Sequence, residues 1–314
     1  MNILIRSLAG DEIAPADHIF RLAFGTLLGL PEPTQFYGDA TYISHRWQAD
    51  PKTVFAAEVD GKLIGSNLVV NWGSFGYFGP LSVHPDYWNQ GVGKRLIASA
   101  IAYFTAQNTQ LTGLFTFAQS PKNHAIYQKF GFRLRFLTAI LAKPVVQPTK
   151  PLVPGTRFSQ MSLVERASSL KASYQLTDAI YPGLDVSSEI QTVENQGLGE
   201  TIFLWDDTGL VGFAVCHIGA GTEAGSNNCF VRFGAVRPGS DAGQLFEQLL
   251  DLCEALTTTL GMSRLIAGVN TSREEAYLRM LARGFRSDFI GVAMHQPNEP
   301  GYNRPDVFVI DDWR

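Results

Sequence analysis

Residues 79–94 read GPLSVHPDYWNQGVGK, and this stretch determines how the rest of the chain is organised. Leu81 and Val83 lie two positions apart, as do side chains on one face of a β-strand. Pro85 ends the strand because it has no N–H group for a sheet ladder. After the turn, apolar residues recur at every fourth position, which predicts a helix that begins near Val92.

Two glycines stand at the predicted start of that helix. The first N–H groups of a helix have no internal partner, and the helix dipole favours negative charge there. Gly91 and Gly93 have no side chain to keep a large anion from the backbone. The pattern indicates a cradle for a phosphate or pyrophosphate, although a plain tight turn before a helix accounts for it equally well. A dinucleotide fingerprint would need glycine in place of Leu96, and a P-loop would need glycine in place of Trp88.

Further motifs follow along the chain. An apolar strand is predicted at residues 114–118, and residues 123–132 read NHAIYQKFGF. Together with the glycines, these segments resemble the GNAT superfamily of acyl-CoA N-acyltransferases, whose loop is a third kind of phosphate cradle. The matching motifs are, in order, Val83-His84-Pro85, Gly91-Val92-Gly93, Asn123 and Tyr127 to Phe132. Trp88 is a departure, because the family usually has Gln or Arg there and this chain has Gln90 two residues later.

The resemblance implies a mixed α/β (α+β) fold, in which a twisted, mostly antiparallel sheet is flanked by helices. It implies that the strands near residues 79–83 and 112–119 splay apart and that the pantetheine arm of CoA lies along the exposed backbone. Acetyl-CoA would be the acyl donor, with no metal involved. The implied cofactor-binding residues are Leu81, Ser82, Val83, Gln90, Gly91, Val92, Gly93, Lys94, Arg95 and Asn123.

Tyr127 is the candidate catalytic residue. When an amine attacks the thioester, CoA leaves as a thiolate, which a neighbouring phenol can protonate. The other interpretation is a core tyrosine ahead of the Gly-Phe turn. Asn123 likewise has two interpretations, a bond to the pantetheine arm or a cap for its helix. No general base is identified, because the acidic and histidine side chains of this region have no motif support.

Aromatic residues are frequent after the first predicted helix, residues 17–30. They are Phe36, Tyr37, Tyr42, His45 and Trp47. In the GNAT superfamily the corresponding helix lies over the acceptor entrance. These side chains therefore either wall a substrate pocket or pack the helix onto the sheet.

The chain shows signs of a duplication. Its 314 residues are more than twice the usual size of one domain, about 100–150 residues. Val236-Arg237-Pro238 repeats Val83-His84-Pro85, and Arg283-Gly284-Phe285 repeats Phe130-Gly131-Phe132. Both matches have an offset of 153 residues (236 − 83 and 285 − 132), as a duplicated domain would. We predict two tandem GNAT-type domains, 1–146 and 156–314, joined by a proline-rich linker at 147–155.

The second copy differs from the first where chemistry is expected. Val83 and Leu96 are 13 positions apart, whereas Val236 and Leu245 are 9 apart and have no Gly-x-Gly between them. Met280 stands where the first copy has Tyr127. We expect the C-terminal domain to be catalytically inert and to shape the acceptor site or support the fold.

Composition limits the classes of partner. A net charge of -4 and a pI near 5.9 argue against a nucleic-acid partner held by a general basic surface. The three cysteines lack C-x-x-C spacing, which argues against a disulfide framework or a zinc site. No signal-peptide core opens the chain, and no stretch approaches the roughly 20 apolar residues of a membrane helix. We expect a cytoplasmic protein with no membrane partner, and a homodimer is one option for its oligomeric state.

The leading functional hypothesis is an N-acetyltransferase that moves an acetyl group from acetyl-CoA to a primary amine by direct attack. The sequence does not identify the acceptor, a small-molecule or peptide amine, although the modest acidity slightly favours a cation. The alternative from another class is a CoA-binding sensor or interaction protein that keeps the fold without the transferase activity. A nicotinamide oxidoreductase is a third hypothesis, and Leu96 argues against it.

Overall fold

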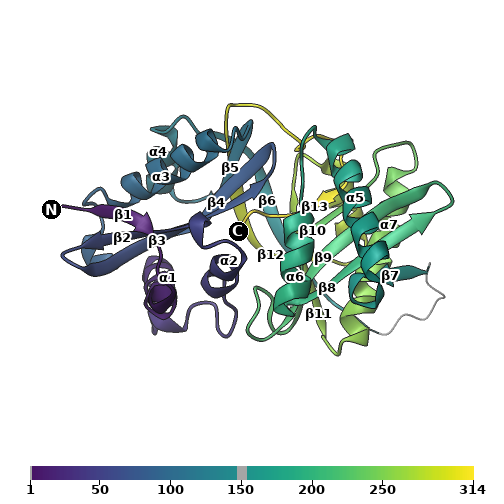
Figure 1. Ribbon diagram of the computed structural model, residues 1–314, viewed down its shortest axis with the longest axis horizontal. Coiled ribbons are helices and arrows are strands. Elements are labelled where there is room, and N and C mark those ends of the chain that lie inside the picture. The colour runs from purple at the N-terminus through teal and green to yellow at the C-terminus, as the bar shows by residue number, and fades with distance from the viewer. Residues whose placement is uncertain (1, 147–153) are drawn as a thin grey trace.

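The computed structural model describes residues 2–146 and 154–314, which form one continuous, curved sheet with helices on both faces (Figure 1). The elements of the first half are β1 (Leu4–Ser7), α1 (Ile13–Leu27), α2 (Ile43–Ala49), β2 (Val54–Val59), β3 (Lys62–Trp72), β4 (Phe75–Val83), α3 (Val92–Ala106), β5 (Leu111–Phe117), α4 (Pro121–Gln128) and β6 (Arg133–Pro144). Those of the second half are β7 (Gly155–Arg157), α5 (Leu163–Ile180), α6 (Ser187–Gln196), β8 (Gly199–Asp206), β9 (Gly209–Gly219), β10 (Gly225–Val236), α7 (Ala242–Thr259), β11 (Arg264–Asn270), α8 (Glu274–Ala282), β12 (Arg286–Gln296) and β13 (Val309–Ile310).

The second half repeats the element order of the first, and only β13 is extra. β5 and β11 begin at residues 111 and 264, α4 and α8 at 121 and 274, and β6 and β12 at 133 and 286. Each pair is 153 residues apart, which is the offset found between the sequence motifs. The mixed α/β fold and the tandem arrangement are therefore confirmed. The boundary at 147–155 stays a prediction, because residues 147–153 lie outside the described part of the chain.

The two halves exchange their last long strands. The strand order runs β1-β2-β3-β4-β5-β12-β6-β11-β10-β9-β8-β7, so β12 of the second half lies between β5 and β6 of the first. In turn, β6 pairs antiparallel with β11, from Arg264↔Pro144 to Asn270↔Thr138. Each half therefore completes the sheet of the other.

Alternating side chains of the sheet pack under helices on opposite faces. Leu68 of β3 belongs to the core with Phe20 of α1, whereas its neighbour Val69 belongs to the core with Ile97 of α3. Figure 1 shows α1 and α2 on one side of this half and α3 and α4 on the other. Under α5 and α6, the core of the second half also includes Trp72 of β3, so the halves share one core at their junction.

Buried charges also join the halves. Arg46 Nε of α2 lies 2.9 Å from Glu223 Oε1 in the second half, with the two side chains only 7% and 2% exposed. Burial opposes ionisation of Glu223, but the guanidiniums of Arg46 and Arg232 outweigh it and lower the pKa of the carboxyl to about 2. Breaking such a pair by removing one partner leaves an unpaired buried charge, which costs about 3–5 kcal/mol.

None of the helices within residues 2–146 and 154–314 has the length and apolar character that a bilayer crossing requires.

Candidate active site

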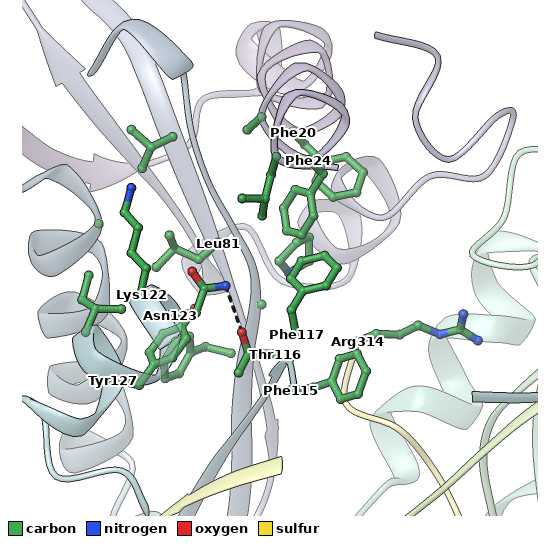
Figure 2. A pocket seen from close by; sticks show the side chains of 18 of the residues that line it. Phe20, Phe24, Leu81, Phe115, Thr116, Phe117, Lys122, Asn123, Tyr127 and Arg314 are labelled. Atoms are coloured by element: carbon green, nitrogen blue, oxygen red, sulfur yellow. Dashed lines mark hydrogen bonds between the residues drawn. The ribbon is translucent and has the colours of Figure 1, made fainter. Parts of the chain in front are cut away.

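β4 and β5 separate at the centre of the first half. These parallel strands pair only from Phe75↔Leu111 to Tyr77↔Gly113. A register shift between β3 and β4 coincides with Gly79 and Pro80, where β4 bends away from a regular ladder. A cavity of about 750 Å³ lies between the diverging strands, bounded by residues of α1, α3 and α4 (Figure 2).

Most of the residues predicted to bind the cofactor line this cavity. They are Leu81, Val83, Gly91, Val92, Gly93, Lys94 and Asn123, and Tyr127 lies with them. Three predicted residues lie elsewhere. Ser82 points to the other face of β4, where its hydroxyl lies 3.1 Å from that of Ser66. Gln90 donates to the carbonyl oxygen of Asp86, and Arg95 donates to the carbonyl oxygen of Ile3.

The loop before α3 has the conformation that an anion cradle needs. Gly91 is the residue before the first turn and has φ +88°, in the left-handed region that favours glycine. Within the described residues no side chain caps this end of α3, so the N–H groups of Val92 and Gly93 are available to a ligand. Lys94, Lys122 and Lys129 add positive charge to the cavity lining.

Trp88, the departure from the family pattern, anchors the loop to the sheet. Its Nε1 donates to the carbonyl oxygen of Val83 at 2.7 Å, and the ammonium of Lys122 lies 5.6 Å from its ring centroid. The indole therefore replaces a polar loop residue with a fixed bridge between β4 and the loop. The same hydrogen bond already uses the carbonyl oxygen of Val83, one of the groups expected to face the cofactor.

Tyr127 lies on α4 with its ring in the core and its hydroxyl at the cavity. The ring packs 5.9 Å from that of Phe78, and in the described structure no hydrogen bond involves the hydroxyl. Burial raises the pKa of Tyr127 to about 12, so the phenol is protonated at neutral pH. Asn123 Nδ2 donates to Thr116 Oγ1 at 3.1 Å (Figure 2), while Ser120 caps the helix. The interpretation of Asn123 as the helix cap is therefore wrong.

The opposite wall is aromatic and includes residues of both halves. Phe36, Tyr37 and Tyr42 line the cavity, whereas His45 and Trp47 do not. No motif or periodicity indicated the contribution of the second half, which consists of Ile266, Asp288, Phe289, Trp313 and Arg314. Asp288 and Phe289 belong to β12, which the strand exchange brings beside β5.

The equivalent place in the second half is occupied by the chain itself. β13 pairs with β10 through Gly234↔Ile310 and Ala235↔Val309, and residues 234 and 235 are the counterparts of Leu81 and Ser82. A Cβ on Gly243, the second residue of α7, would lie 2.6 Å from Arg279 Nη2. The counterpart of Arg279 in the first half is Ile126. The Met280 side chain, at the counterpart of Tyr127, is fully buried.

Comparisons with known proteins agree with this architecture. Residues 22–132 match the model of the Acetyltransferase (GNAT) family. The sequence has no significant match among curated proteins.

Solved structures share the fold over nearly the whole chain. A candidate acetyltransferase from Pyrococcus horikoshii superposes with a TM-score of 0.70 at 13% identity, covering 99% of this chain and 95% of that one. A GCN5-related N-acetyltransferase from Sphaerobacter thermophilus has a TM-score of 0.61 at 16% identity, covering 94% and 95%. A tandem GNAT protein from the clavulanic acid biosynthesis pathway has a TM-score of 0.57 at 12% identity, covering 94% and 98%. Residues 22–132 therefore match the GNAT family, and the chain as a whole shares the fold of tandem GNAT proteins.

Proposed function

We propose that the protein is an acetyl-CoA-dependent N-acetyltransferase that acts on a primary amine by direct attack. One observation carries the proposal. A single cavity brings together the uncapped start of α3, the unpaired part of β4 and the hydroxyl of Tyr127. The start of α3 would bind the pyrophosphate of acetyl-CoA, and the unpaired part of β4 would bind its extended pantetheine chain. The hydroxyl of Tyr127 would then lie near the thioester.

The lining residues fit the parts of acetyl-CoA. The N–H groups at Val92 and Gly93 and the ammonium groups of Lys94 and Lys122 would hold the pyrophosphate. The backbone near Leu81 would pair with the pantetheine amides as an added strand. Asn123 has an amide oxygen left to accept a hydrogen bond, because its nitrogen already donates to Thr116.

The proposed reaction needs no covalent enzyme intermediate. The amine attacks the thioester carbonyl carbon as the free base, so the C–N bond forms while the C=O π electron pair moves to oxygen. When the carbonyl re-forms, the C–S bond breaks and sulfur takes its electron pair. The Tyr127 hydroxyl donates a hydrogen bond to the departing sulfur in the transition state, and the proton that the amine releases then neutralises the thiolate. An N–H group of β4 would stabilise the oxyanion of the tetrahedral intermediate.

We further propose that the second half binds no CoA, since β13 and Arg279 fill the corresponding place. Its role is then to complete the sheet and to supply one wall of the cavity.

The test combines calorimetric titration of acetyl-CoA into the full chain with an assay of thiol release in the presence of amines. Binding together with amine-dependent release would support the enzyme. Binding without release for any amine would favour the CoA-binding sensor. The absence of binding would refute both hypotheses.

A further inference from the structure

The wall opposite Tyr127 is an unbroken series of aromatic rings. The ring centroids of Phe36 and Phe24 lie 5.5 Å apart, those of Phe24 and Phe117 6.1 Å, and those of Phe117 and Phe289 5.4 Å. Phe115 extends the series, 6.0 Å from Phe289. The rings come from α1 and the loop after it, from β5 and from β12 of the second half.

All five rings are half-buried and line the cavity, so each has a surface that a ligand can cover. Figure 2 shows Phe24, Phe115 and Phe117 across the cavity from Asn123 and Tyr127. An apolar group that displaces water from such a surface gains about 25 cal/mol for each Å² buried. The wall therefore favours an apolar body next to the reacting amine.

The charges of the cavity point the same way. Among the described residues that line it, the cationic ones are Lys94, Lys122, Lys129 and Arg314. Asp288 is the only lining carboxylate in that set, and it pairs with Arg264. A polyamine or an aminoglycoside would bring further ammonium groups, and each would lose water without a free carboxylate to replace it.

We propose that the acceptor is a primary amine on an aromatic or bulky apolar body, with no second cationic group. This inference rests on the proposed function, since it names the substrate class of the same site. It differs from the slight preference for a cationic acceptor that the net charge suggested, and the charge of the whole chain is weak evidence about one cavity.

Matched pairs of amines test the two parts of the proposal. Pentylamine and 1,5-diaminopentane share a carbon chain, but the second carries an additional ammonium group. 2-Phenylethylamine and ethylamine differ by the ring. We expect kcat/KM to be at least about tenfold higher for pentylamine and for 2-phenylethylamine than for their counterparts.

Two adjacent residues of β12 provide the variant and its control. Phe289→Asp puts a carboxylate into the wall and should reduce or reverse the preference for pentylamine over 1,5-diaminopentane. Ile290 is 42% exposed and does not line the cavity, so Ile290→Asp should leave the preference unchanged. If Phe289→Asp fails to fold, Phe289→Leu should keep the preference for pentylamine but lower kcat/KM for 2-phenylethylamine.

The outcomes separate this inference from the proposed function. Equal or faster acetylation of 1,5-diaminopentane by the wild type would overturn the acceptor class and leave the transferase intact. If acetyl-CoA binds but no amine is acetylated, the acceptor class is tested by calorimetric titration of the amines into the CoA-loaded protein. Binding of 2-phenylethylamine but not of 1,5-diaminopentane would then support the class while the transferase fails, and binding of neither would overturn both. Preferred use of octanoyl-CoA with no preference among amines would assign the wall to the acyl chain and overturn the class.

Discussion

Replacing Tyr127 with phenylalanine tests the proposed chemistry with little disturbance of the fold. The ring would keep its packing against Phe78 in the core between α3, α4 and the sheet. In the described structure the hydroxyl has no hydrogen-bond partner that its removal would leave unpaired. The free energy of unfolding should therefore change by less than about 0.5 kcal/mol, the usual range for a change that breaks no contact.

The size of the catalytic effect follows from the pKa of the phenol. Burial raises the pKa of Tyr127 to about 12, whereas an aliphatic thiol such as cysteine has a pKa of about 8.5. Complete proton transfer to the thiolate is therefore uphill, and the hydroxyl acts chiefly as a hydrogen-bond donor in the transition state. General acids contribute about 10²–10⁴-fold, and this mismatch places Tyr127 near 10², or about 2.7 kcal/mol. Since the phenol stays protonated, it adds no alkaline limb to the pH profile below about pH 11.

The assay is thiol release under saturating acetyl-CoA, with calorimetry for the affinity of CoA. Tyr127→Phe should lower kcat about 10²-fold and leave CoA affinity nearly unchanged. An acetyl thioester with an aryl thiol leaving group needs no proton, so the variant should be much less impaired with it. Tyr103→Phe on α3, outside the cavity, is the control. Unchanged kcat, or equal losses with both donors, would refute the role of the phenol.

Four further predictions address binding and stability. Gly93→Glu should abolish acetyl-CoA binding in calorimetry, whereas Gly93→Ala, whose Cβ meets only side-chain carbons at 3.7 Å, should retain most of it. Because β13 fills the place in the second half that corresponds to the cofactor cavity, calorimetric titration should give one acetyl-CoA bound per chain. A stoichiometry near two would contradict this. Burial lowers the pKa of His217 to about 4, so the folded state stays neutral while the unfolded chain takes up a proton below 6.5. In urea unfolding, the stability that depends on His217 should be complete above pH 6.5 and fall by about 3 kcal/mol toward pH 4, so His217→Phe should lose about that much less stability than the wild type over this range. Because the halves exchange strands, residues 1–146 and 154–314 should not fold as separate monomers, but co-expressed they should elute as a 1:1 complex.

The sequence was enough to predict the half of the site that lies on local structure. Gly91 and Gly93 stand at the start of a helix whose position follows from apolar periodicity, whereas Asn123 and Tyr127 were identified by their resemblance to the GNAT motif. The 153-residue offset located the second copy because duplication preserves spacing along the chain. Ser82 was expected to face the cofactor through its backbone groups, so the position of its side chain on the other face of β4 leaves that prediction untested.

The aromatic wall could not be predicted in the same way. Phe289 is far along the chain from Phe117, and the two meet only because β12 pairs with β5. β6 and β12 occupy equivalent positions in the two copies, so the local sequence pattern of either strand is compatible with pairing to the edge of β5. Long-range packing decides between the two pairings, and neither periodicity nor a motif records that choice. The indole bridge of Trp88 was missed for a related reason, because a departure from a motif does not reveal what the new side chain contacts.

The strand exchange gives a physical reason for a second half without a cofactor slot of its own. If β12 were lost, β5 would have an unpaired edge and the cavity would lose Phe289 from its wall. Loss of Glu223 would leave Arg46 buried without its carboxylate. An arginine at position 279 fills the place in the second half that corresponds to the cofactor cavity, and its presence removes none of these contacts. The second site is therefore free to degenerate, while the fold of that half remains necessary to the first.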